Sequence, residues 1–147
     1  MTKKIILASD HAAADFIQEI SEYLKSTGYE CTLLKDEAAF TYAEAADAVV
    51  SHVHASADVL GIACCGTGLG ISMRANRHKG IRATLIHDAF TAEMAALHSH
   101  ANIICMGSRV LTAKQACALL DIVLNTPFEG GRHIPRIEQL DVPTGEK

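Results

Sequence analysis

Five short apolar runs alternate with five segments of helical periodicity along this chain, and that alternation limits the folds open to it. The first run, residues 4–9, is apolar and β-branched without polar alternation, which predicts a strand buried on both faces. The later runs cover 29–34, 59–63, 80–86 and 102–106, and the helical segments cover 12–26, 42–55, a stretch after the glycines at 66–70, 91–98 and 112–124. Such alternation predicts an α/β fold with a five-stranded parallel sheet covered by helices on both faces.

The composition is that of one globular domain spanning residues 1–147. Hydrophobic residues make up 49% of the chain, which is enough for a single well-filled core, and no linker divides it. Aromatic residues make up only 5% and the formal net charge is −4, so nothing favours base stacking or a general attraction to nucleic acid or anionic lipid. We therefore expect neither nucleic acid nor a membrane as partner, and local binding of any phosphate-sized anion.

The five cysteines are an odd number without a CxxC pair, which predicts reduced thiols and a cytoplasmic location. The start of the chain superficially resembles a signal peptide, but its apolar run stops at Ser9-Asp10-His11, so we interpret it as the first strand. No apolar stretch approaches the roughly 20 residues that a membrane span requires.

A thiol pair followed by glycines stands where the third apolar run ends: Cys64-Cys65-Gly66-Thr67-Gly68-Leu69-Gly70-Ile71-Ser72. Glycines let the backbone approach a ligand closely, and amides at a helix N-terminus favour an anion. A thiol in such a place has a lowered pKa, which suits a proton-transferring base as well as a nucleophile. Cys65 directly precedes Gly66, whereas we place four cysteines in strand and core: Cys31, Cys64, Cys105 and Cys117. The alternative is a tight turn that packs a buried cysteine.

Three familiar loop chemistries fit this spacing poorly. A dinucleotide fingerprint needs GxGxxG after the first strand, whereas here GxGxG follows the third strand. A Walker loop needs Gly-Lys-Ser/Thr, which is absent. A thiol phosphatase loop has an arginine where Ile71 stands. What remains is a thiol beside amides that can hold an oxyanion.

Chemically useful side chains follow four of the five predicted strands: Asp10-His11, Cys65 with its glycines, His87-Asp88 and Ser108-Arg109. Ligands of open parallel sheets bind beyond the carboxyl ends of the strands, so this convergence favours a reaction site over plain packing.

The histidines and arginines leave more than one interpretation open. His98 and His100 are two apart, like His52 and His54, and no third ligand stands at recognisable spacing, so we predict no metal and no cofactor. Arg109, Arg132 and Arg136 are candidates for an anion clamp, because guanidinium forks fit phosphate oxygens. Arg132 and Arg136 would share a helix face if the tail from residue 127 is helical. The alternative is a solvated basic face.

With these residues together, the chain resembles the type B ribose-5-phosphate isomerase family, which includes galactose-6-phosphate and allose-6-phosphate isomerases. The shared motifs cover nearly the whole chain: Ser9-Asp10-His11-Ala12, the run 65–72, Ala75-Asn76, Gly80-Ile81-Arg82-Ala83, His98, Asn102, Gly107-Ser108-Arg109, and Glu129-Gly130-Gly131-Arg132-His133 with Arg136.

The resemblance implies a Rossmann-like three-layer α/β/α sandwich and a metal-free aldose-ketose isomerase of a sugar phosphate. It also implies a homodimer or tetramer whose active sites are shared between subunits. By this analogy Cys65 moves a proton between C1 and C2, while Thr67 and the loop amides, of Gly66, Gly68, Leu69 and Gly70, hold the enediolate oxygens. His98 and Asp10 would assist ring opening, Tyr42 would line the sugar pocket, and the phosphate would be held by His11, Arg109, Arg132 and Arg136.

The departures from the family pattern fall at positions expected to touch the sugar. Thr41-Tyr42-Ala43 keeps only the tyrosine of an Asp-Tyr-Pro pattern, Ser99 replaces an asparagine, and Ala13 replaces a glycine. The expected pair is ribose 5-phosphate and ribulose 5-phosphate, with a four- or six-carbon sugar phosphate as the alternative. A non-catalytic flavodoxin-like module that binds a phosphate ligand is the alternative from another class.

Overall fold

The architecture comes from a computed structural model that describes residues 3–145, so the ends of the predicted domain, residues 1–2 and 146–147, lie outside it. The described strands are β1 (Lys4–Ser9), β2 (Glu30–Leu33), β3 (Val59–Cys65), β4 (Ala83–Leu85) and β5 (Ile103–Gly107). The described helices are α1 (Ala14–Ser26), α2 (Tyr42–Ala55), α3 (Leu69–Ala75), α4 (Ala89–Leu97), α5 (Ala113–Asn125) and α6 (Ile134–Asp141), with 3₁₀ turns η1 (His11–Ala13) and η2 (Gly131–His133).

The sheet is parallel throughout residues 3–145, with the strand order β2-β1-β3-β5-β4, which confirms the predicted α/β sandwich. The chain runs outward from β1 to β2 and then crosses to β3 on the other side of β1. The carboxyl ends of β1 and β3 therefore form the switch point at which open sheets bind ligands. A hydrogen bond from the Asp10 amide to the Cys64 carbonyl, 3.3 Å long, ties these two ends together.

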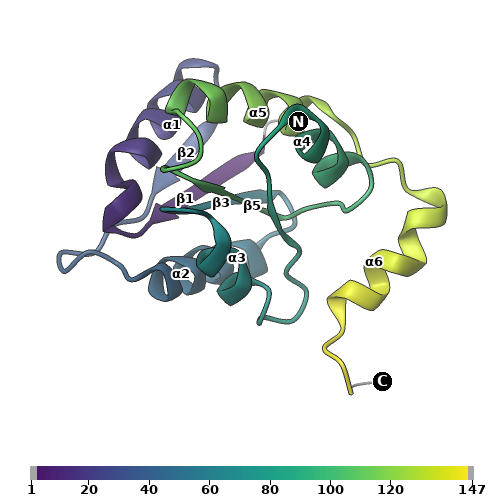
Figure 1. Cartoon of the computed structure of the whole chain (residues 1–147). Coiled ribbons are helices and arrows are strands. Elements are labelled where there is room, and N and C mark those ends of the chain that lie inside the picture. Colours follow the sequence, from purple (N-terminus) through teal and green to yellow (C-terminus); the bar gives the residue numbers. More distant parts are fainter. Residues whose placement is uncertain (1–2, 146–147) are drawn as a thin grey trace.

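The sheet is buried on both faces because its side chains alternate between two cores. Ile5 and Leu7 of β1 belong to the core beneath α1, α4 and α5, whereas Ile6 and Ala8 belong to the core beneath α2 and α3. Figure 1 shows the two helical layers on opposite sides of the strands. This explains why the predicted strands are nearly continuous apolar runs.

Some element boundaries differ from the sequence prediction for local reasons. β3 is longer than predicted and includes both Cys64 and Cys65. β4 is shorter than predicted, because two amides at its start donate hydrogen bonds to side chains. The Ala83 amide donates to Asn76 Oδ1 at 2.8 Å, and the Arg82 amide donates to Asn102 Oδ1 at 2.7 Å. α4 begins early because Asp88 caps it, accepting the Thr91 amide at 2.8 Å. The predicted Thr112 cap of α5 is confirmed by a capping box with Gln115.

The carboxyl-terminal helix α6 stands apart from the sandwich. Figure 1 shows α6 beyond the amino edge of the sheet, which is the edge opposite the strand arrowheads. Its end is attached to the body through Asp141, whose carboxylate pairs with Arg82 at 2.8 Å and whose carbonyl accepts the Gly80 amide. Among residues 3–145, no helix combines the length and apolar character that crossing a membrane requires.

Candidate active site

The loop between β3 and α3 closes around the Cys65 thiol. Cys65 ends the strand with only 5% of its surface exposed, and its Sγ accepts a hydrogen bond of 3.2 Å from the Gly68 amide. The Cys65 carbonyl accepts the Ser108 amide and the Gly66 carbonyl accepts the Arg109 amide, which fastens the loop to the end of β5. The thiol is thus held in one place at the switch point.

Two glycines in this loop are required by its geometry. Gly68 has a φ of 81°, and a Cβ there would lie 2.5 Å from the Leu85 side chain and 2.9 Å from the Met106 carbonyl carbon. A Cβ on Gly70 would lie 2.8 Å from the Tyr42 ring. The loop backbone therefore packs directly against β4, β5 and the start of α2, so these two glycines are required by the packing of the loop itself.

The other thiols are poor candidates for a base. Burial raises the pKa of the Cys64 thiol well above its ordinary value, and nearby Cys105 adds to the rise. Burial likewise raises the pKa of Cys105 and of Cys31, and raises the pKa of Cys117 to about 11. These four thiols stay protonated near neutral pH, which fits their predicted packing role and leaves Cys65 as the candidate.

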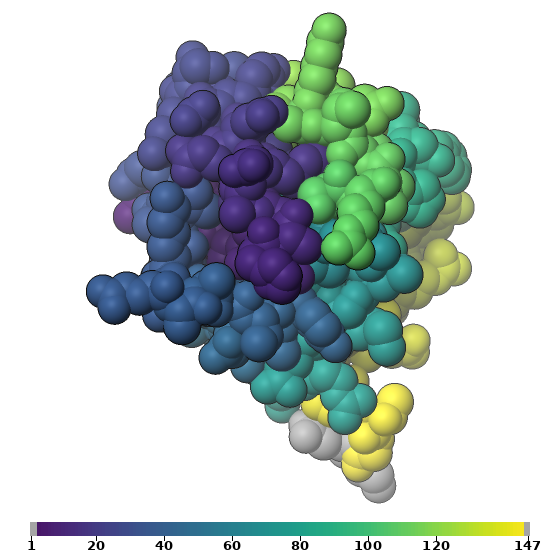
Figure 2. Space-filling view, turned by 60° about the vertical axis from the view of Figure 1, so that its left-hand side comes forward, coloured from purple at the N-terminus to yellow at the C-terminus, as the bar shows by residue number. Residues whose placement is uncertain are grey.

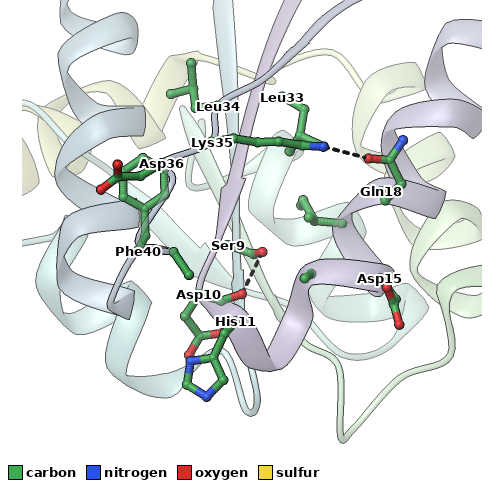
Figure 3. Close-up of a pocket in the computed structure, with 13 residues that line it drawn as sticks. Ser9, Asp10, His11, Asp15, Gln18, Leu33, Leu34, Lys35, Asp36 and Phe40 are labelled. Atoms are coloured by element: carbon green, nitrogen blue, oxygen red, sulfur yellow. Dashed lines mark hydrogen bonds between the residues drawn. The ribbon is translucent and has the colours of Figure 1, made fainter.

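Asp10 and His11 lie at the end of β1, next to the loop. Among the described residues, Asp10 Oδ1 is one of the buried side-chain atoms without a hydrogen-bond partner. A buried carboxylate oxygen without a partner is costly unless a ligand satisfies it, so this atom is a candidate for substrate contact. Both residues also line a cavity of about 310 Å³ between α1 and the segment after β2, with Phe40 on one side and the bonded pair Lys35 and Gln18 above them (Figure 3).

Several other predicted residues gather around the same edge. Tyr42 is the first residue of α2, is 48% exposed and packs against Gly70. Thr67 is exposed, and its hydroxyl accepts the Leu69 amide at 3.2 Å. The Arg109 side chain lies over the loop, where a Cβ on Gly66 would be 3.4 Å from it. Figure 2 shows the segments after β1, β3 and β5 meeting on this face.

The remaining predicted residues lie on the opposite side of the molecule. α4 starts at the carboxyl end of β4 and returns to the amino end of β5, so His98 and Ser99 follow it at the amino edge of the sheet. Arg132 in η2 and Arg136 in α6 belong to the segment that Figure 1 places beyond that edge. One chain therefore brings together the loop residues but does not bring these four to Cys65.

Arg132 and Arg136 would share a helix face only if one regular helix carried both, and the structure places them in different elements. Arg132 lies in the 3₁₀ turn and Arg136 in α6, because the chain bends at Gly130, which precedes the 3₁₀ turn with a φ of 69°, and at Gly131, which begins it with a φ of 55°. Both guanidinium groups remain exposed.

Sequence reasoning missed a third partner for His98. Three side chains meet in a cluster that we call the triad: His98, Glu129 and His133. The nitrogen and oxygen atoms that they offer lie within 4.8 Å of one another, so the fold supplies His98 with a third candidate metal ligand that the spacing of the histidines did not reveal. The signal in the sequence was the four-residue spacing of Glu129 and His133 on either side of Gly130-Gly131.

Comparison with known proteins decides what kind of site this is. Residues 5–140 match the model of the ribose/galactose isomerase family. The chain belongs to this family. The probable ribose-5-phosphate isomerase B of Mycoplasma genitalium is 37% identical over 144 residues, covering 95% of each chain. Ribose-5-phosphate isomerase B of Escherichia coli is 33% identical over 143 residues, covering 94% of each.

Solved structures agree with the sequence relatives. A crystal structure of ribose 5-phosphate isomerase from Thermotoga maritima matches with a TM-score of 0.90 and 38% identity, over 96% of this chain and 99% of that one. The Mycoplasma genitalium structure with bound ribulose-5-phosphate matches with a TM-score of 0.84 and 35% identity, over 95% of each. The protein is therefore a sugar-phosphate isomerase, which confirms the resemblance drawn from the motifs and sets aside the non-catalytic module.

Proposed function

We propose that this enzyme interconverts ribose 5-phosphate and ribulose 5-phosphate through an enediolate, with Cys65 as the base. The observation that carries the proposal is the position of the Cys65 thiol. It stands at the carboxyl end of β3, accepts a hydrogen bond from the Gly68 amide, and is adjacent to the loop of residues 66–70. The relative from Mycoplasma genitalium, whose structure contains ribulose-5-phosphate, supports the choice of sugar.

The proton transfer uses groups of the chain alone. The Cys65 thiolate removes the proton from C2 of the open-chain aldose, the electrons of the C2–H bond form the C1–C2 double bond, and O1 takes the negative charge. Return of the proton to C1, with transfer of the O2 proton to O1, gives the ketose. Amides of residues 66–70 and the Thr67 hydroxyl stabilise the charged oxygens, because preorganised donors act most strongly where charge develops. This scheme requires neither a metal nor a cofactor.

The other predicted residues serve the two ends of the sugar. Asp10, with its unpartnered Oδ1, and His98 assist ring opening, and Tyr42 lines the pocket beside Gly70. His11, Arg109, Arg132 and Arg136 hold the phosphate, whose oxygens suit guanidinium forks. Ser99 lies next to His98 and contacts the sugar.

We further propose a homodimer in which one subunit's loop meets the partner's tail. The support is that the two groups of predicted residues lie at opposite edges of one chain. Large apolar side chains are exposed on three helices: Met73 of α3 and Phe90 of α4 are each 70% exposed, and Leu140 of α6 is 61% exposed. Exposed apolar surface of this kind marks protein interfaces. The five free thiols favour the cytoplasm as its compartment.

Replacement of Cys65 by alanine tests the base directly. In D₂O, the wild-type enzyme should exchange the C2 proton of ribose 5-phosphate with solvent, and Cys65→Ala should reduce that exchange by at least about a thousandfold. Cys64→Ala is the matched control, because its thiol is adjacent, buried in the other core and kept protonated. Near-normal exchange in Cys65→Ala would contradict the role of this residue.

A panel of four-, five- and six-carbon aldose phosphates tests the substrate. We expect the highest kcat/KM with ribose 5-phosphate. The departures at Ser99 and around Tyr42 favour the alternative of another sugar phosphate, and a higher kcat/KM with a four- or six-carbon sugar would establish it.

A further inference from the structure

Glu129 connects two imidazole rings through one oxygen atom. Its Oε2 lies 3.2 Å from His98 Nε2 and 3.0 Å from His133 Nε2. The two rings stack with centroids 4.2 Å apart and planes 20° from parallel. The contact fixes both the position and the tilt of His98.

The donor and acceptor inventory assigns the protons in this triad. An ionised carboxylate only accepts hydrogen bonds, so each ring must carry a proton on Nε2. Arg132 Nε also lies 3.5 Å from His133 Nε2 and would need that nitrogen as an acceptor. We assign the Nε2 proton to the shorter contact, in which His133 Nε2 donates to the Glu129 carboxylate at 3.0 Å. His98 can therefore exchange a proton with a substrate only through Nδ1.

Backbone hydrogen bonds make the triad a rigid unit. The Glu129 amide donates to the Leu97 carbonyl at 3.0 Å, which attaches the tail to the residue before His98. The His133 side chain is 7% exposed and anchors the cluster from the inside, whereas the His98 side chain is 34% exposed. His133 is thus the buried member of the triad, whereas His98 and Glu129, whose side chains are 34% and 48% exposed, are accessible from the surface.

We propose that Glu129 is a positioning residue for ring opening, an inference that rests on the proposed function. With Nε2 held by Glu129, His98 Nδ1 takes the proton from the anomeric O1 while the C1–O4 bond breaks and C1=O1 forms. The same proton then passes to O4, so the imidazole ends as it began. Glu129 stabilises the transient imidazolium and keeps the ring oriented, as the carboxylate of a hydrolase triad does for its histidine.

The test separates ring opening from proton transfer between carbons. Ribulose 5-phosphate has no ring form that must be opened, because its O5 carries the phosphate. We therefore compare wild type, Glu129→Gln and the control Glu22→Gln, an exposed hydrogen-bonded carboxylate on α1, in both directions. Circular dichroism and melting confirm folding, and His133→Asn, which removes the second ring from the carboxylate, serves as an independent variant.

We expect Glu129→Gln to consume ribulose 5-phosphate in proportion to enzyme concentration, within about threefold of the wild-type rate. Its consumption of ribose 5-phosphate should stop rising with enzyme concentration and level off at the spontaneous rate of ring opening, with a smaller effect in His133→Asn. A proportional response in both directions, or equal loss in both, would overturn the role of Glu129. Absence of turnover in the wild type would instead overturn the proposed function.

Discussion

Two variants, each lacking one catalytic group, can show that each active site is built from two chains. Cys65→Ala removes the base from the loop, and His98→Asn removes the ring-opening group at the end of α4, which lies with the tail at the opposite edge of the same chain. If loop and tail of one chain never meet, a dimer that contains one chain of each kind has one site with both changes and one site with neither.

The expected recovery follows from this arrangement and from two-fold symmetry. Random reassociation of equal amounts makes half of the dimers mixed, and half of their sites intact, so the mixture should regain about a quarter of wild-type activity. The assay is ribose 5-phosphate turnover after the two variants are unfolded together in urea and refolded, with each variant refolded alone as control. A mixture no more active than its components would refute the shared site. Turnover by Cys65→Ala alone would refute the role of Cys65, and turnover by His98→Asn alone that exceeds the spontaneous rate of ring opening would refute the role of His98.

Four further changes have expected outcomes. Gly68→Ala should lower the free energy of unfolding by about 1–2 kcal/mol for its left-handed φ and by about 1–3 kcal/mol more for overpacking. Gly28→Ala, at φ 102° with nothing within 4 Å of its Cβ, should lower it only by the first amount. Equal melting temperatures of the two variants would contradict this. Burial and nearby cations lower the pKa of His100 in the folded state, so the unfolded state takes up the proton at a higher pH and stability falls as pH drops below about 7. His100→Asn should flatten this pH dependence in urea titrations, because asparagine tolerates the φ of 47° at this position. Thr112→Ala should lower stability by about 1 kcal/mol through loss of the α5 cap, with Thr112→Ser unchanged in melting experiments. EDTA should leave turnover intact, whereas Zn²⁺ should inhibit through the triad, and His133→Asn should raise the inhibitory concentration roughly tenfold.

The sequence predicted the layers of this fold because strands buried on both faces appear as continuous apolar runs and the helices that cover them show helical periodicity. Ile5 to Ala8 show why: alternate residues enter different cores, and each must be apolar. The short β4 was not predictable in this way, because the amide bonds from Asn76 and Asn102 that limit it come from side chains distant in sequence. Periodicity reports burial, and it carries no information on such capping contacts.

The loop half of the site was likewise predictable, since the thiol and glycines are contiguous and follow a strand. The role of Glu129 was not predictable, because it depends on contact with His98, which lies thirty-one positions earlier and meets Glu129 only in the folded chain. The separation of His98 from Cys65 could have been inferred, because a helix between parallel strands returns the chain to the amino edge of the sheet.

That separation links the assembly of the enzyme to its chemistry. The loop supplies a base and oxyanion donors for proton transfer between C1 and C2, whereas His98 and the tail together supply the triad for ring opening and two of the proposed phosphate ligands. A lone chain would hold the thiol at an edge that lacks His98, Arg132 and Arg136. Dissociation should therefore abolish turnover of the ring form more completely than turnover of an open-chain substrate, because only the first needs His98 as well as the arginines of the tail.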